Sequence, residues 1–111
     1  MKVYVLRYCF AAHGEDFTRA VHMTYKGALL DKCSYLLEVL LDMDWDNEGT
    51  EAIGDIDQAF HLHDPITVGE LTQYIDTLES YADTIELYAQ IEEFPSHDPC
   101  YNICFHFVLR H

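Results

Sequence analysis

The strongest structural signal in the chain lies at residues 26–43, which read KGALLDKCSYLLEVLLDM. Apolar side chains recur there at intervals of three and four residues, the spacing that places them on one face of an α-helix. The positions that form and widen this face are Leu29, Cys33, Leu36, Leu37 and Leu40, joined by Leu30, Tyr35, Val39 and Leu41. A face this wide predicts a mostly buried helix, and the same leucines could alternatively form the seam of a dimer.

The residues before this helix predict a β-hairpin. Residues 3–10 are rich in Val, Tyr, Leu and Phe, and residues 17–25 predict a second strand. Between them, Gly14 and the acidic pair Glu15 and Asp16 are typical of a turn. The opening residues carry a charge inside a short apolar run and lack a small-residue cleavage site, so we interpret them as a strand and not as a signal peptide.

The residues after the helix predict an acidic loop, a second helix and two further strands. Residues 44–57 are acidic and contain two glycines, which favours a loop. Thr67 and Glu70 have the spacing of a capping box, so we expect a helix from Val68 to about Tyr81. Residues 82–93 fit both a helical and an alternating pattern, and we favour a strand.

The clearest strand signal lies near the end of the chain. Pro95 and Pro99 favour a turn, after which apolar side chains alternate at Tyr101, Ile103, Phe105, Phe107 and Leu109. The predicted order is ββα, acidic loop, αββ. We therefore expect one α+β domain over residues 1–111, with an antiparallel sheet of about four strands and two helices packed on one face.

The composition excludes several classes of function. The chain has 111 residues, with 20 Asp and Glu against 6 Lys and Arg, and a formal net charge of −14. Phosphate groups repel such a surface, so direct binding to nucleic acid or to an anionic membrane is not expected. No apolar run reaches the roughly 18 residues of a membrane span. The four cysteines lack a C-x-x-C pair, and we expect reduced thiols and a cytoplasmic protein.

The distribution of charge is more informative than its sum. No Lys or Arg occurs between Cys33 and Leu109, whereas five of the six basic residues lie in the first 32 positions. Ordinary surfaces intersperse both signs, because like charges repel and disfavour the compact state. The arrangement is therefore either tolerated for solubility or retained to meet a basic partner. In the second case, the carboxylates would imitate an array of phosphates.

One acidic segment resembles a known metal-binding loop. Asp44-Trp45-Asp46-Asn47-Glu48-Gly49, followed by Asp55, is similar to the calcium loop of the EF-hand family. The resemblance implies calcium ligation by Asp44, Asp46, Glu48 and Asp55. The segment departs from the pattern at Glu48, Glu51 and Asp55, and no second loop exists to pair with it. An acidic surface loop is the preferred interpretation, with calcium binding as an alternative.

Other metal or catalytic sites are not indicated. Among His97, Cys100, Cys104 and His106, a strand would place the two cysteines roughly 13 Å apart, too far for one zinc ion. No nucleophile with a positioned base, glycine-rich phosphate loop or H-E-x-x-H pattern is present. We therefore expect no metal, no cofactor and no enzymatic activity.

In size and charge, the chain resembles the small acidic inhibitors made by phages and mobile elements: DNA-mimic anti-restriction proteins, anti-CRISPR proteins and nuclease immunity proteins. The resemblance implies a stoichiometric inhibitor that occupies a basic nucleic-acid channel on a host defence enzyme or nuclease, in the host cytoplasm. We expect the partner contact at Asp42, Asp44, Trp45, Asp46, Glu48, Glu51, Asp55 and Asp57, with Glu92 and Glu93 as a second patch. An acidic dimeric scaffold, a homodimer formed through residues 26–43, is a further alternative.

Overall fold

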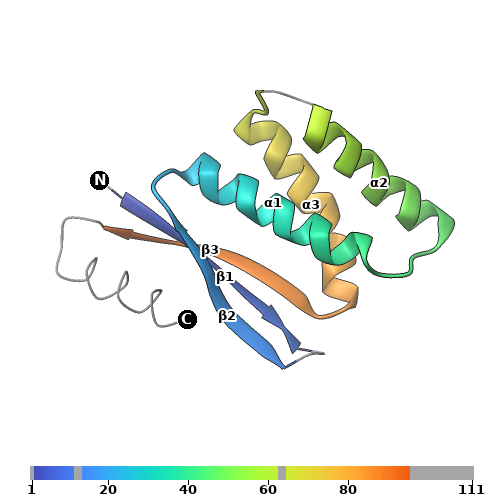
Figure 1. Cartoon of the computed structure of the whole chain (residues 1–111), viewed down its shortest axis with the longest axis horizontal. Helices are drawn as coiled ribbons and strands as arrows, with labels where there is room; N and C mark the ends of the chain where they lie inside the picture. Colours follow the sequence, from blue (N-terminus) through green and yellow to red (C-terminus); the bar gives the residue numbers. More distant parts are fainter. Residues whose placement is uncertain (1, 12–13, 63–64, 96–111) are drawn as a thin grey trace.

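The computed structural model describes residues 2–11, 14–62 and 65–95 (Figure 1). Over these residues the protein is an α+β fold with a three-stranded antiparallel sheet and three helices, in the order ββαααβ. The elements are β1 (Lys2–Phe10), β2 (Glu15–His22), α1 (Tyr25–Leu41), α2 (Asn47–Leu62), α3 (Val68–Thr84) and β3 (Leu87–Pro95). None of the helices in this part of the chain is long and apolar enough to cross a membrane.

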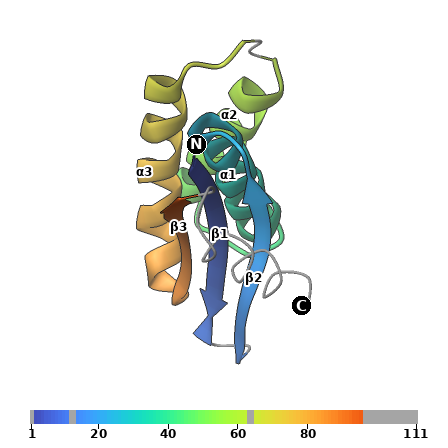
Figure 2. The same ribbon diagram turned by 90° about the vertical axis from the view of Figure 1, so that its left-hand side faces the viewer.

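The sheet has the order β2-β1-β3, with the helices covering one of its faces (Figure 2). The predicted hairpin is confirmed: β1 pairs with β2, and Gly14 adopts the positive φ of 64° that its turn requires. β2 ends at His22, earlier than expected, because the Thr24 side chain accepts a 3.0 Å hydrogen bond from Gly27 N and caps α1. Because β1 also pairs with β3, Lys2 at the start of the described chain lies opposite Pro95 at its end.

The helix predicted from residues 26–43 is confirmed as α1 and forms the centre of the core. It contacts all three strands and both other helices. Leu36 and Leu40 are fully buried, and Leu29 and Leu37 are almost completely buried. Most of the leucines considered for a dimer seam are thus packed inside the monomer, whereas Leu41 is exposed.

The prediction of two helices and four strands is wrong for the described residues, because the segment expected to be an acidic loop forms α2. Ile53 is buried, and Ile56 and Phe60 pack against the core, so this helix has an apolar stripe of its own. Gly49 lets its first turn approach closely, since a Cβ there would lie 3.2 Å from a ring carbon of Tyr81. The strand expected at residues 101–109 falls outside the described part of the chain.

The capping box is confirmed at the start of α3. The Thr67 hydroxyl accepts a 3.1 Å hydrogen bond from Glu70 N, and the Glu70 carboxylate accepts one of 3.2 Å from Thr67 N. The ambiguous segment that follows contains both predicted patterns in sequence. The helix continues to Thr84, Glu86 turns the chain with a φ of 56°, and the strand begins at Leu87.

Candidate functional site

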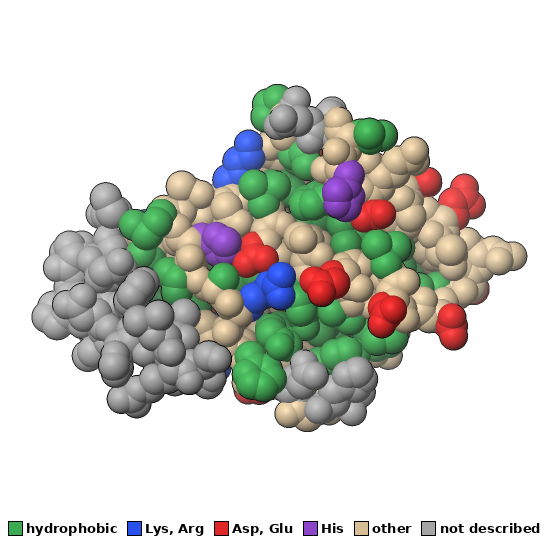
Figure 3. All heavy atoms as spheres, in the orientation of Figure 1, with side chains coloured by type: hydrophobic (Ala, Val, Ile, Leu, Met, Phe, Trp, Pro, Cys, Tyr) green, Lys and Arg blue, Asp and Glu red, His purple; other side chains and the backbone are tan. Residues whose placement is uncertain are grey.

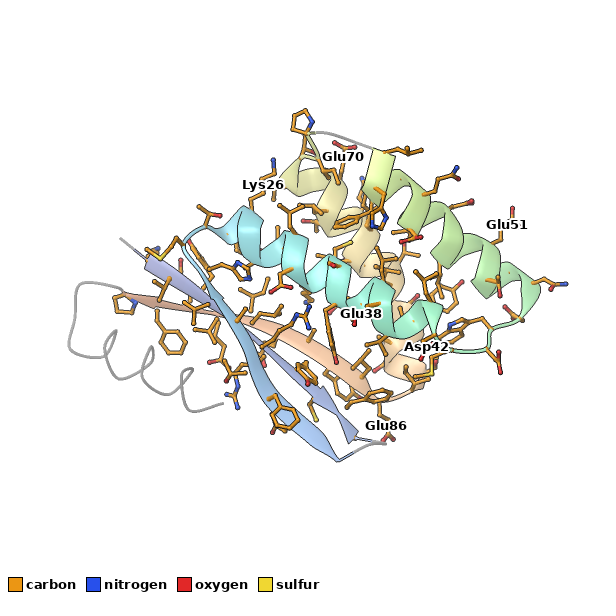
Figure 4. All side chains as sticks on the ribbon, viewed as in Figure 1. Lys26, Glu38, Asp42, Glu51, Glu70 and Glu86 are labelled. Carbon is orange, nitrogen blue, oxygen red and sulfur yellow. The ribbon has the colours of Figure 1, made fainter. Side chains whose placement is uncertain are left out.

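Exposed carboxylates gather where α1 ends and α2 begins. We call this group the acidic end; its members are Glu38, Asp42, Asp44, Asp46, Glu48, Glu51 and Asp55. Figure 3 shows acidic side chains over this side of the molecule, and basic side chains near the start of α1 and in the middle of the face, beside other acidic side chains. Figure 4 shows Glu38, Asp42 and Glu51 on the side away from Lys26. The fold thus brings together six of the carboxylates predicted as partner contacts and adds Glu38.

Trp45 holds the segment that carries these carboxylates. Its Nε1 donates a 2.7 Å hydrogen bond to the carbonyl of Leu40, and its ring meets Tyr81 edge-on at 5.4 Å. The side chain is half-buried against the core. Trp45 was predicted as a contact residue in a hydrophilic loop, but the structure gives it an internal partner and makes it the anchor that positions Asp44 and Asp46.

The carboxylates at the start of α2 stabilise that helix. Asp46 Oδ1 accepts a 2.7 Å hydrogen bond from Gly49 N, as a helix-capping residue does. Glu48 lies in the first turn, where the partial positive charge of the helix terminus favours an anion. Asp46 and Glu48 therefore have a structural role in addition to their exposure.

The carboxylates at the end of α1 have no such role. Glu38 and Asp42 are four residues apart, and the last turn of α1 contains no basic residue. Like charges at this spacing cost about 0.2–0.5 kcal/mol, and an anion at a helix C-terminus opposes the helix dipole by about 0.3–1 kcal/mol. Glu51 and Asp55 repeat the same spacing on α2. Local helix electrostatics thus does not favour these four carboxylates.

Basic residues from the first 32 positions form ion pairs with carboxylates in other parts of the molecule. Lys2 Nζ lies 3.1 Å from Glu93, and Arg7 Nη1 lies 3.3 Å from Glu92. A hydrogen bond from Lys2 to Glu93, together with their opposite charges, raises the pKa of Lys2 above its ordinary value. The predicted second patch is therefore already paired with cations of β1.

The carboxylates of the acidic end, in contrast, are not paired with the basic residues that the structure describes. Lys32 pairs with Glu79 on α3 at 3.1 Å, and Asp57 pairs with His61 at 3.2 Å within α2. Among the residues that the structure describes, no ion pair joins a Lys or Arg to a carboxylate of the acidic end. The Asp57 side chain is half-buried and faces His61 of the same helix, so we do not count it as part of the acidic end.

The calcium loop suggested by the sequence is not formed. α2 begins at Asn47, so Asp55 lies two turns along a regular helix, about 12 Å from its start. The oxygens of Asp46 and Asp55 consequently do not surround one point. Within the described ranges, no group of three or more His, Cys, Asp or Glu side chains is placed to hold a metal ion. His97, Cys100, Cys104 and His106 lie outside those ranges.

A groove beside the acidic end was not predicted from the sequence. It has a volume of about 570 Å³ and is lined by side chains of β1, α1 and the residues after α1: Tyr8, Phe10, Tyr35, Glu38, Val39, Leu41, Asp42 and Met43. The rings of Tyr8 and Tyr35 lie 4.6 Å apart in it. Its residues come from separate elements, and no local pattern marks them. The groove sets aromatic and apolar surface directly beside two carboxylates of the acidic end.

The chemistry available at this end is the binding of cationic groups. Exposed carboxylates accept charge-assisted hydrogen bonds from lysine and arginine side chains, and the neighbouring groove can take apolar or planar groups. No protein-family model matches the chain, and no curated protein or solved structure is significantly similar to it.

Proposed function

We propose that the protein is an acidic, non-enzymatic inhibitor that presents carboxylates in place of nucleic-acid phosphates. Its acidic end would enter a basic nucleic-acid-binding site on a host defence enzyme or nuclease, as anti-restriction and anti-CRISPR inhibitors do. The observation that carries this proposal is the uncompensated pair Glu38 and Asp42, kept exposed at the helix end least suited to anions. We propose the cytoplasm as its place of action.

The groove next to the acidic end supports a protein partner over a simple counter-ion. Protein interfaces favour an apolar or aromatic centre within a polar rim, and arginine is enriched among their strongest contacts. The protein itself contains an example of the expected contact: Arg19 lies 4.9 Å above the ring of Tyr35 while its Nε donates a 3.0 Å hydrogen bond to Asp31. An arginine of the partner would bind in the same way, stacked in the groove and paired with Glu38 or Asp42.

The proposal is tested by neutralising the acidic end without disturbing the fold. We expect Asp42→Asn, Asp44→Asn and Asp46→Asn, combined, to weaken inhibition in an assay of DNA cleavage by a panel of restriction enzymes, CRISPR nucleases and toxin nucleases. Asn is as good a helix cap as Asp, so α2 is preserved. The matched control removes the same charge elsewhere, by Asp76→Asn, Asp83→Asn and Glu86→Gln. Equal inhibition by both triple variants would contradict the proposed contact.

A further inference from the structure

A second groove lies between β3 and the helices α1 and α3, and it shares no lining residue with the groove beside the acidic end (Figure 2). Its volume is about 750 Å³, which is within the range typical of small-molecule sites. The apolar part of its lining comes from α1 and β3: Leu29, Leu36, Leu87, Ala89 and Ile91. All of these except Ile91 are buried, so they form an apolar floor on which a hydrocarbon chain would be removed from water.

One wall of this groove is formed by α3 and is acidic. Asp76, Glu79 and Asp83 line it, because residues three, four and seven positions apart lie on the same side of a helix. Lys32 of α1 is the one Lys or Arg of the lining that the structure describes; it is mostly buried and pairs with Glu79 at 3.1 Å. The lining therefore has three carboxylates and one ammonium group, which leaves two negative charges without a counter-charge.

Asp76 and Asp83 supply these two charges at separate points of the wall. Both are exposed, and neither is paired with a cation in the part of the chain that the structure describes. Asp83 faces β3, since burial and then the charge of Asp83 raise the pKa of Tyr88 above its ordinary value. The two aspartates are seven residues apart on one helix, which corresponds to about 10.5 Å along its axis.

We propose that this groove binds an aliphatic dication: a linear diamine whose two ammonium groups pair with Asp76 and Asp83 while its hydrocarbon chain lies on the apolar floor. An extended covalent chain advances about 1.2 Å per bond, so roughly nine bonds, as in an eight-carbon diamine, span the distance between the two carboxylates. A hydrocarbon chain without polar groups gives up no hydrogen bond to water when it lies on this floor. The site uses none of the carboxylates of the acidic end and is independent of the proposed inhibition.

The test compares aliphatic amines in calorimetric titrations of the full chain at physiological salt. We expect the eight-carbon diamine to bind more tightly than the eight-carbon monoamine, which has one charge, and more tightly than the four-carbon diamine, which is too short to reach both carboxylates. In NMR spectra, its binding should shift the methyl signals of Leu29, Leu36 and Leu87. Shifts confined to the leucine and valine methyl groups of the groove beside the acidic end would overturn the proposal.

Spermidine separates this site from the general attraction of cations to an acidic protein. It has the length of the eight-carbon diamine but carries a third charge in the middle of its chain, where the apolar floor would remove that charge from water. We therefore expect spermidine to bind more weakly than the eight-carbon diamine despite its higher charge. Tighter binding of spermidine would overturn the proposal, because affinity would then follow charge alone.

Two pairs of substitutions at exposed positions locate the contact. Asp76→Asn and Asp83→Asn should each weaken binding of the eight-carbon diamine about two- to fivefold and reduce its advantage over the monoamine. The matched control, Glu51→Gln with Asp55→Asn, removes two charges from the acidic end and should leave the affinity within about twofold, because distant exposed charges are screened at this salt. Equal weakening by this control and by Asp76→Asn combined with Asp83→Asn would contradict the assigned site.

Discussion

Glu38 lies in the last turn of α1 and Asp42, four residues further on, is the C-cap of this helix; both are exposed, where the terminal carbonyl groups already concentrate negative charge. Asp46 and Glu48, only a few residues further on, lie at the start of α2, where negative charge is favoured. The acidic end therefore combines carboxylates that stabilise the fold with carboxylates that oppose it. Residues retained against stability are typical of binding sites.

The first prediction concerns this difference. Glu38→Gln combined with Asp42→Asn should raise the free energy of unfolding by about 0.5–1 kcal/mol, because it removes a like-charge pair and two anions from the end of α1. Glu48→Gln should lower it by a few tenths of a kcal/mol, roughly, since it removes an anion from the start of α2. Urea denaturation measures both. Destabilisation by the double variant would show that these carboxylates have favourable partners.

A second prediction compares two glycines of α2. A Cβ at Gly49 would lie 3.0 Å from Asp46 Oδ1 and 3.2 Å from both Trp45 Cβ and a ring carbon of Tyr81, whereas a Cβ at Gly54 has nothing within 4 Å. Gly54→Ala should stabilise the protein by about 0.5–1 kcal/mol through helix propensity. Gly49→Ala should destabilise it despite the same gain. Thermal unfolding of the two variants gives the comparison, and stabilisation by both would mean that α2 does not approach Trp45 and Tyr81 closely.

Trp45 gives a third prediction. Trp45→Phe keeps an aromatic ring but removes the donor to Leu40 O, and should cost about 1–2 kcal/mol because that carbonyl loses its side-chain partner. It should also weaken inhibition, since Asp44 and Asp46 are held by this contact. As the single tryptophan of the chain, Trp45 reports on the acidic end by its fluorescence in the native protein. An unchanged unfolding midpoint would show that the hydrogen bond contributes nothing.

The fourth prediction is a dependence of stability on pH. Burial raises the pKa of the Cys33 thiol from 9.0 to about 12. Above pH 9.0 the unfolded chain loses this proton and the folded chain keeps it, so unfolding releases a proton. The free energy of unfolding should therefore fall as the pH rises, by at most about 1.4 kcal/mol per pH unit. In Cys33→Ala the decline should be shallower, and identical slopes in the two proteins would rule out this cause.

The parts of the fold that were predicted correctly depend on local patterns. The leucines of α1 recur at helical spacing, and Thr67 and Glu70 form a capping box that needs only four consecutive residues. α2 was missed because Gly49 and the surrounding carboxylates are typical of a loop. Its stripe of Ile53, Ile56 and Phe60 is a helical signal that outweighs them once it packs on α1 and α3.

The structure places the central carboxylates of the predicted site close together and separates those at its margins. Asp42 to Asp55 are close together in sequence, so their gathering follows from one connection between two helices. The pairing of Glu92 with Arg7 depends on β3 lying beside β1, which places residues 85 positions apart in contact. The groove formed by Tyr8 and Tyr35 likewise depends on the packing of α1 on the sheet. Contacts between residues so far apart in the chain leave no recognisable local pattern in a single sequence.

The most direct test of the central claim is the form of inhibition when a nuclease that the protein inhibits is assayed at increasing DNA concentrations. If the acidic end takes the place of nucleic-acid phosphates, protein and DNA exclude each other, and the concentration needed for half inhibition should rise in proportion to the DNA present. A half-inhibiting concentration that does not change with DNA would contradict the claim, because the protein and the nucleic acid would then bind at separate places.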